Sequence, residues 1–199
     1  MKRATFLLVG LAALFMVTGG WASEYEIDAS HSAVMFKVKH LGISTVTGRF
    51  EKFSGSFDFD TADIPASKAS AVIEVAGINT GVEKRDEHLR SADFFHADSY
   101  PQMAFVSKEV TRAEGEGFQI AGDLTLHGVT RPVTLDVEIG GMVTDMSGKD
   151  RAAFTATTSI HRKDFGLTWS KMLETGGLVV GETVRIILEI EGIRKKETK

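Results

Sequence analysis

Hydrophobic and polar side chains alternate along most of this chain with a repeat of two residues. The clearest alternating stretches are residues 34–40, 53–59, 120–126, 133–139 and 184–190. Successive side chains of a β-strand point to opposite faces, so each stretch predicts a strand with one buried and one solvated face. Weaker signals predict further strands at residues 71–75, 102–110 and 152–162. Roughly eight strands at this spacing predict an antiparallel barrel or a sandwich, an all-β fold in either case.

Turn residues separate the predicted strands. Residues 114–117 and 146–150 are rich in glycine and polar residues and predict hairpin loops. The short segment 127–130 joins two strongly alternating strands. Pro132, just after it, predicts the start or the edge of a strand, because proline has no N–H to donate to a sheet.

One segment breaks the alternation and predicts a short helix. Thr80 and Glu83 have the spacing of a capping box, and Val82, Arg85 and Leu89 follow at helical spacing. A single short helix in a β-protein is expected to cover an opening of the sheet. Arg85 lies on the apolar stripe of this helix, which has two interpretations. Its stem packs on apolar surface while its head finds a structural partner, or its head meets an anionic ligand.

The N-terminus has the layout of a secretory signal peptide. Lys2 and Arg3 precede an apolar run over residues 6–17, and small residues at positions 20 and 22 form a cleavage site. We therefore expect a signal peptide over residues 1–22, a domain over residues 23–199, a periplasmic location and no stable membrane insertion after cleavage. The alternative is an uncleaved anchor, since weakly apolar residues extend the run to about 20 residues.

Composition excludes several function classes. The chain contains no cysteine, which removes disulfides, thiol nucleophiles and zinc–thiolate sites. Its formal net charge of −4 gives it no electrostatic reason to bind nucleic acid. The sequence shows no nucleophile elbow, phosphate-binding loop or dinucleotide fingerprint, and its six histidines lack the spacing of a helical metal site. We expect no catalytic residue, no metal and no cofactor.

The apolar residues supply the positive signal. Thirteen phenylalanines are a heavy load for one small domain, and many fall on inward faces. An eight-stranded barrel either fills its interior with side chains or encloses one ligand. Inward positions with small residues, Gly55, Ala71 and Gly122, are expected to leave room and favour a cavity.

Four sequence blocks, given below in chain order, resemble those of the YceI-like family and together cover essentially the whole chain after residue 22. The first spans residues 25–28, 31–42 (HSAVMFKVKHLG), 48–50 and 53–57, and the second spans 85–95 (RDEHLRSADFF), 100–101 and Phe105. The third spans 122–130 (GDLTLHGVT) and 132–133, and the fourth is 163–166 (KDFG).

This resemblance implies an extended, eight-stranded, lipocalin-like antiparallel barrel that binds a polyisoprenoid or a similar long-chain amphiphile in a hydrophobic pore. It implies transport or storage of the lipid in the periplasm, without enzymatic activity. The residues expected to line the pore are Phe36, Val38, Ile73, Val75, Leu124, Leu126, Leu135, Val137, Phe154 and Leu188. Those expected to close it are Phe94, Phe95, Phe165 and Trp169, and Arg85 and Arg162 are candidates for the lipid head group.

Two other functions fit the same barrel. A structural or stress-response protein would have a filled core, and an enzyme acting on a lipophilic substrate would use the pore as an active site. Exposed strand edges and the outward Met35 also permit a homodimer.

Overall fold

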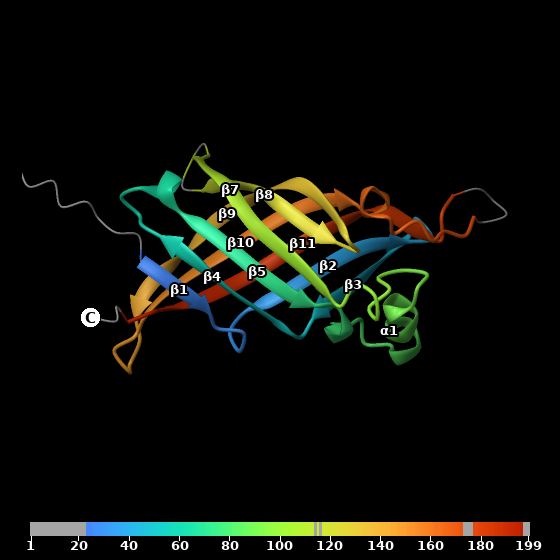
Figure 1. Ribbon diagram of the computed structural model, residues 1–199, viewed down its shortest axis with the longest axis horizontal. Coiled ribbons are helices and arrows are strands. Elements are labelled where there is room, and N and C mark those ends of the chain that lie inside the picture. Colours follow the sequence, from blue (N-terminus) through green and yellow to red (C-terminus); the bar gives the residue numbers. More distant parts are fainter. Residues whose placement is uncertain (1–22, 114, 116, 173–176, 197–199) are drawn as a thin grey trace, which may run out of the picture.

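The computed structural model describes residues 23–113, 115, 117–172 and 177–196 as one antiparallel sheet with one α-helix (Figure 1). Its strands are β1 (Ser23–Ile27), β2 (Ala33–His40), β3 (Ser44–Phe50), β4 (Phe53–Phe59), β5 (Lys68–Glu74), β6 (Ile78–Asn79), β7 (Gln102–Arg112), β8 (Phe118–Leu126), β9 (Val129–Thr144), β10 (Asp150–His161) and β11 (Val180–Arg194). The helix α1 covers Glu83–Arg90, and three 3₁₀ turns are η1 (Ile64–Ala66), η2 (Val75–Gly77) and η3 (Arg162–Phe165).

The sheet closes into an eight-stranded barrel. Its strands follow the order β1–β4–β5–β7–β8–β9–β10–β11, and β11 pairs with β1 to complete the circle. β2, β3 and β6 extend β1, β4 and β5 respectively, because β2 pairs with both β11 and β3, and β3 pairs with β6. The result is a long up-and-down barrel, with α1 at one end (Figure 1). The expected all-β barrel with one short helix is confirmed.

Three long strands are interrupted without losing their neighbours. Between β3 and β4, the Glu51 N–H donates to the Gly77 carbonyl and the Lys52 carbonyl accepts from Glu74 N–H, both at 2.9 Å. Opposite this break, η2 separates β5 from β6. These bends let strands too long for a straight barrel follow its twist.

The predicted hairpins form where glycine and polar residues gather. Asp145 N–H donates to the Lys149 carbonyl at 2.8 Å, and Ala113 N–H donates to the Gly117 carbonyl at 3.2 Å. Pro132 lies in the first part of β9, which pairs with β8 before its pairing with β10 begins at Asp136. Its missing N–H therefore removes no bond of the β9–β10 ladder. Of the two predicted positions, the start or the edge of a strand, the edge is the observed one, since β9 begins at Val129.

The predicted capping box is wrong. The helix begins after Val82, whose side chain forms no cap, and α1 is preceded by a different arrangement. Both the N–H and the hydroxyl of Thr80 donate to Asp86, which is 4% exposed. The spacing correctly predicted a helix here, but it predicted that the Glu83 carboxylate accepts from Thr80. The acceptor is the Asp86 carboxylate, which lies about one turn further along the helix.

The expectation that small inward residues leave space is also wrong for two glycines. A Cβ at Gly122 would lie 2.6 Å from the Phe105 ring, and one at Gly55 would lie 2.3 Å from the Ser70 carbonyl oxygen. These glycines permit close approach of a ring and of a neighbouring strand. Their space is already occupied.

The predicted signal peptide, residues 1–22, lies outside the described residues. Among the residues that the structure does describe, no helix combines the length and the apolar character needed to cross a membrane.

Candidate functional site: an apolar tunnel

Two adjoining hollows lie inside the barrel. The larger, here called the mouth cavity, has a volume of about 190 Å³ and is reached by Leu89 of α1 and by Phe94 and Phe95, which follow it. Every residue that lines it is apolar except Thr158 and Arg162. Inward positions of nearly every strand contribute to this lining, as the period-two pattern predicts. Met35 is an exception, because the alternation placed it outward and it nevertheless lines the cavity beside Phe36.

The second hollow, here called the inner cavity, has a volume of about 110 Å³ and lies towards the end of the barrel away from α1. The two cavities share a ring of lining residues, namely Ile27, Ala71, Phe105, Leu135, Leu188 and Ile190. We therefore treat them as one tunnel with a constriction. Their joint size reaches the lower bound of about 300 Å³ that is usual for ligand pockets.

Most of the predicted pore residues lie on this tunnel. The mouth cavity is lined by Phe36, Val38, Ile73, Phe94, Phe95, Leu124, Leu126, Leu135, Leu188 and Arg162. The inner cavity is lined by Val137 and Phe154, together with Leu135 and Leu188.

Four predicted site residues do not line either cavity. Val75 falls in η2, where the strand breaks, and is 1% exposed within the packed core. Phe165 is 2% exposed in η3 and also belongs to that core. Trp169 packs with its ring centroid 5.0 Å from that of Phe94, so it supports a lining residue from behind. The fourth is Arg85, described below.

Sequence reasoning missed other lining residues for two reasons. Phe53, Ile160, Val184 and Ile186 continue the alternating pattern and were available from it. Leu167 and Val180 lie in or beside the long β10–β11 connection, where no alternation identifies the inward side. Their place in the mouth depends on tertiary folding of that connection.

Arg162 is a buried cation at the mouth cavity. It is 3% exposed, and its guanidinium donates to the backbone carbonyls of Leu167, Val180 and Gly181, the last at 2.9 Å from Nε. Burial lowers the pKa of Arg162 from its ordinary value, although the nearby Glu182 opposes this. Within the described residues no carboxylate forms an ion pair with it. The site therefore holds one positive charge, fixed in position, beside an otherwise apolar cavity.

Arg85 has a different environment. Its Nε donates to the Thr80 hydroxyl at 2.7 Å, and one terminal nitrogen donates to the Thr80 carbonyl at 2.9 Å. Asp86 receives its bonds from the same threonine. Arg85 thus fastens α1 to the segment before it, which favours the structural interpretation over the head-group one.

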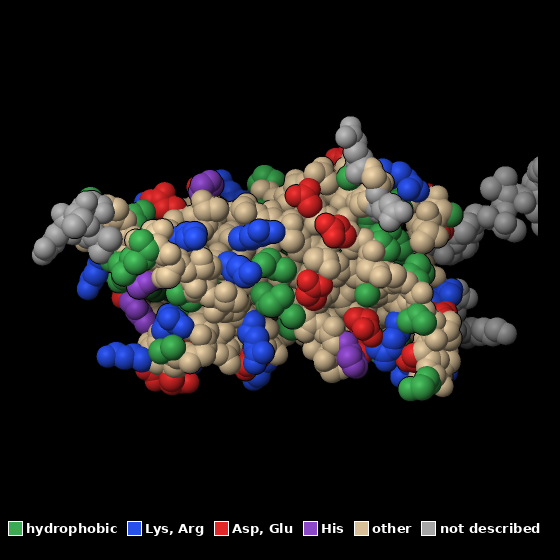
Figure 2. All heavy atoms as spheres, turned by 180° about the vertical axis from the view of Figure 1, so that it is seen from behind, with side chains coloured by type: hydrophobic (Ala, Val, Ile, Leu, Met, Phe, Trp, Pro, Cys, Tyr) green, Lys and Arg blue, Asp and Glu red, His purple; other side chains and the backbone are tan. Residues whose placement is uncertain are grey.

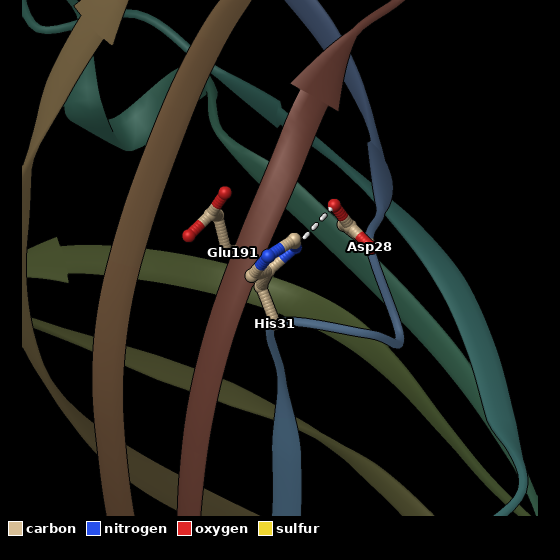
Figure 3. A group of neighbouring side chains, drawn as sticks. All are labelled: Asp28, His31 and Glu191. Carbon is tan, nitrogen blue, oxygen red and sulfur yellow. Dashed lines mark hydrogen bonds and ion pairs between the residues drawn. The ribbon is translucent and has the colours of Figure 1, made fainter. Parts of the chain in front are cut away.

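A charged cluster lies on the outside of the barrel, at the break between β1 and β2 (Figure 3). Candidate ligand atoms of Asp28, His31 and Glu191 lie within 4.8 Å of one another. Arg151, from β10, also donates to both carboxylates and to Asp145 of the β9–β10 hairpin. The guanidinium supplies the positive charge that a metal ion would bring, so we assign the cluster a structural role at the barrel seam.

The same contacts shift the titration of the carboxylates. Hydrogen bonds from Ser30, His31 and Arg151 hold the pKa of Asp28 far below its usual range. Hydrogen bonds from Arg151 and Ser147, followed by the backbone N–H of Lys149, do the same to the pKa of Asp145. Both groups are therefore carboxylates at neutral pH.

Comparison with known proteins gives consistent relatives. The sequence profile described as "YceI-like domain" matches residues 25–192. A UPF0312 protein of Yersinia enterocolitica is 40% identical over 197 residues, covering 98% of both chains. Protein YceI of Escherichia coli is 36% identical over 198 residues, covering 98% of this chain and all of the relative.

Solved structures share the fold. The Campylobacter jejuni YCEI protein matches with a TM-score of 0.69 and 31% identity, covering 98% of this chain and 100% of that one. Burkholderia cenocepacia BcnA matches with a TM-score of 0.73 and 26% identity, covering 83% of this chain and 98% of that one. A domain of Saccharophagus degradans described as polyisoprenoid binding matches with a TM-score of 0.62 at 21% identity, covering 87% and 99% of the two chains, a likeness of fold alone.

Proposed function

The chain belongs to the YceI-like family, and from this membership and the form of its interior we propose that the barrel binds a long-chain amphiphilic lipid, a polyisoprenoid or a similar molecule. The observation that carries the proposal is the tunnel, whose mouth cavity is apolar at every lining residue except Thr158 and Arg162. An apolar, elongated space matches a hydrocarbon chain in shape and in polarity.

Burial of the chain would supply the affinity. Each methylene group moved from water into an apolar site contributes about 0.8 kcal/mol. A wall of aliphatic and aromatic side chains imposes few directional contacts, so the barrel is expected to accept related chains of similar width. Selectivity would then come from chain length and from the head group.

Arg162 is our candidate for the head group. It lines the mouth cavity, while Arg85 lies on neither cavity and is held by Thr80. A guanidinium with fixed position suits a phosphate or a polar oxygen, because its N–H groups form a planar fork. The lipid would enter with its tail towards the inner cavity and its head at Arg162.

We further propose that the protein carries or stores its lipid without chemical change, in the periplasm. The leader-like residues 1–22 support export, and the wall of the mouth cavity offers a hydrocarbon chain no polar residue other than Thr158 and Arg162. The filled-barrel alternative fits less well, since hollows of about 190 and 110 Å³ remain inside the barrel.

Native mass spectrometry of the purified protein tests this proposal, followed by solvent extraction of what co-purifies. We expect a stoichiometric adduct that extracts as an intact long-chain lipid. If an added lipid is recovered from the protein as a chemically altered product, the enzymatic alternative is favoured. A protein without adduct, whose mass does not change after incubation with prenyl lipids, would contradict lipid binding.

A further inference from the structure

The turn between β2 and β3 has an unfavourable residue at its tip. Ile43 N–H donates to the His40 carbonyl at 3.2 Å, and the two residues between them, Leu41 and Gly42, have φ angles of 54° and 74°. Such two-residue turns favour asparagine, aspartate and glycine, because a positive φ crowds the side chain of a residue such as leucine. The tip is also apolar and solvent-facing, with Leu41 36% and Ile43 85% exposed. Strain and exposed apolar surface at one point suggest a surface that is covered in use.

A third exposed apolar side chain lies beside this tip. Leu41 N–H donates to the Val179 carbonyl, and Val179 N–H donates to the Lys171 carbonyl, both at 2.9 Å. The next residue, Met172, is 78% exposed. Val180, which follows Val179, lines the mouth cavity. The apolar tips therefore stand on the rim of the tunnel's mouth.

Basic side chains lie on the strands and the connection that lead to this rim, while exposed carboxylates of α1, Glu83 and Glu87, lie at the same end of the barrel. Lys37 and Lys39 of β2, Arg185 of β11 and Lys171 are exposed, and within the described residues none of them forms an ion pair. Lys37 lies directly opposite Arg185 in the β2–β11 ladder, a like-charge pairing that disfavours folding. Figure 2 shows cationic side chains gathered over the half of the visible face nearer α1, while anionic side chains lie at both ends and in the middle.

The other end of the barrel offers a natural comparison. The β9–β10 hairpin also carries exposed apolar residues, and Met146 at its tip is fully exposed. Carboxylates lie near this tip, Asp145 and Asp150 within the hairpin and Glu191 on β11, but each forms an ion pair, Asp145 and Glu191 with Arg151 and Asp150 with Arg194. The two ends therefore have similar apolar tips, one near basic side chains without an ion pair in the described residues and one near carboxylate–arginine ion pairs.

We infer that the α1 end docks on the surface of an anionic phospholipid bilayer. Leu41, Ile43 and Met172 enter the interfacial region, and the four cations lie over the lipid phosphates. The docking rim, as we call these residues, is Leu41, Ile43, Met172, Lys37, Lys39, Lys171 and Arg185. Docking at this end brings the mouth of the tunnel to the bilayer, where a long-chain lipid can pass between the two without crossing water. None of the three apolar tips lines either cavity, so docking is separable from lipid binding in the barrel.

Co-sedimentation with lipid vesicles tests the inference. The purified full chain is mixed with vesicles of phosphatidylglycerol or of phosphatidylcholine, at low and at high salt. We expect binding to phosphatidylglycerol that weakens at least tenfold at high salt, because surface charges are then screened. The double variant Lys37→Glu, Lys39→Glu should bind at least tenfold more weakly. The matched changes at the other end, Met146→Ser and Lys149→Glu, should leave binding unchanged.

Leu41→Asn gives the sharpest readout. Asparagine tolerates the positive φ of this position, so this variant should melt at a higher temperature than the parent and yet bind vesicles about threefold more weakly. A residue with only a structural role would not separate these two measurements.

Three results would overturn the inference. Equal, salt-independent binding to both vesicle types would mean apolar attachment by another part of the chain, residues 1–22 included. Full binding by the Lys37→Glu, Lys39→Glu variant would exclude the rim. If the protein does not bind phosphatidylglycerol vesicles even at low salt, docking on a bilayer is contradicted. An acidic protein would then be the partner that fits this surface. Lipid capture is measured without vesicles, so either proposal can fail while the other stands.

Discussion

Two arginines near the helical end of the barrel have different environments, which predict a structural role for Arg85 and a ligand-binding role for Arg162. Arg85 donates two hydrogen bonds to Thr80, and it lines neither the mouth cavity nor the inner cavity. We predict that Arg85→Ala lowers the free energy of unfolding by about 1–2 kcal/mol and leaves lipid affinity unchanged, because hydrogen bonds from a charged donor are lost. Urea unfolding and displacement of a fluorescent lipid measure the two effects. Lys84→Ala, an exposed neighbour, is the control; lower affinity with unchanged stability would restore the head-group interpretation.

Arg162 is expected to behave in the opposite way. Arg162→Met keeps much of the side-chain volume and removes the charge, so the preference for a prenyl phosphate over the prenyl alcohol of equal length should fall about tenfold. Stability should also fall by about 2–3 kcal/mol, because three buried carbonyls lose their donor. Arg162→Lys retains the charge and should recover part of the preference. An unchanged preference in Arg162→Met would remove Arg162 from the site.

Asp28 predicts a pH dependence of stability. Its pKa is lowered in the folded protein by Ser30, His31 and Arg151. A carboxyl with a lowered folded pKa stabilises the fold above its unfolded pKa of about 3.9, and the stabilisation is lost as pH falls through the folded value. Asp28→Asn should therefore unfold more easily than the parent at pH 7, with the difference shrinking towards pH 2. Denaturant unfolding over this range measures it, with Asp98→Asn as an exposed control; a difference independent of pH would contradict the assignment.

At the scale of elements, periodicity predicted the strands because the barrel wall separates an apolar interior from water at every residue. It failed where the backbone leaves the strand geometry. Val75 continues the alternating pattern, but η2 turns it away from the tunnel. The role of Asp86 at the start of α1 depends on a contact between side chains six residues apart, which the capping-box spacing does not describe.

Glycines beneath aromatic rings form a second feature that alternation cannot reveal. Phe36 lies over Gly48 of the neighbouring β3, where a Cβ would be 2.3 Å from the ring. Phe36 lines the mouth cavity. The glycine and the ring therefore determine together how much of the cavity remains open.

Substitution of these glycines should have two different results. In Gly48→Ala the ring can move, so we predict that Phe36 shifts into the mouth cavity and that lipid affinity falls about tenfold, with a stability loss of about 1–3 kcal/mol. In Gly55→Ala the obstacle is the Ser70 carbonyl oxygen at 2.3 Å, so the β4–β5 pairing itself must open and the larger effect should be on stability. Thermal melting and lipid displacement for both variants test the contrast; equal profiles would contradict it.

At the scale of the whole molecule, the closed barrel follows from strands that alternate and from turns that keep them antiparallel. The pairing of β11 with β1 is the step that no local signal specifies, because it joins the first and the last described strands, which are far apart in the sequence. The family resemblance supplied it. The division of the interior into two cavities was not predictable, since it depends on how bulky residues from several strands meet at one level of the barrel.

That division predicts a limit on the length of the bound chain. Ala71 belongs to the ring shared by both cavities, and a larger side chain there should close the passage between them. In the parent, affinity should rise with each added methylene by up to about fourfold until the tunnel is full. In Ala71→Leu this rise should stop at a shorter chain, while short prenols bind as before. Displacement of a fluorescent lipid by a prenol series measures both curves.

The control for this experiment is Ala104→Leu, on the neighbouring strand but on neither cavity. It adds the same volume to the same region of the sheet, so it should follow the parent curve over the whole series. Melting temperatures of both variants show whether the barrel has tolerated the larger side chain. If Ala71→Leu is folded and its affinity rises with chain length as in the parent, a bound chain does not pass the ring. The mouth cavity would then be the whole binding site, and its volume alone would set the length that the protein accepts.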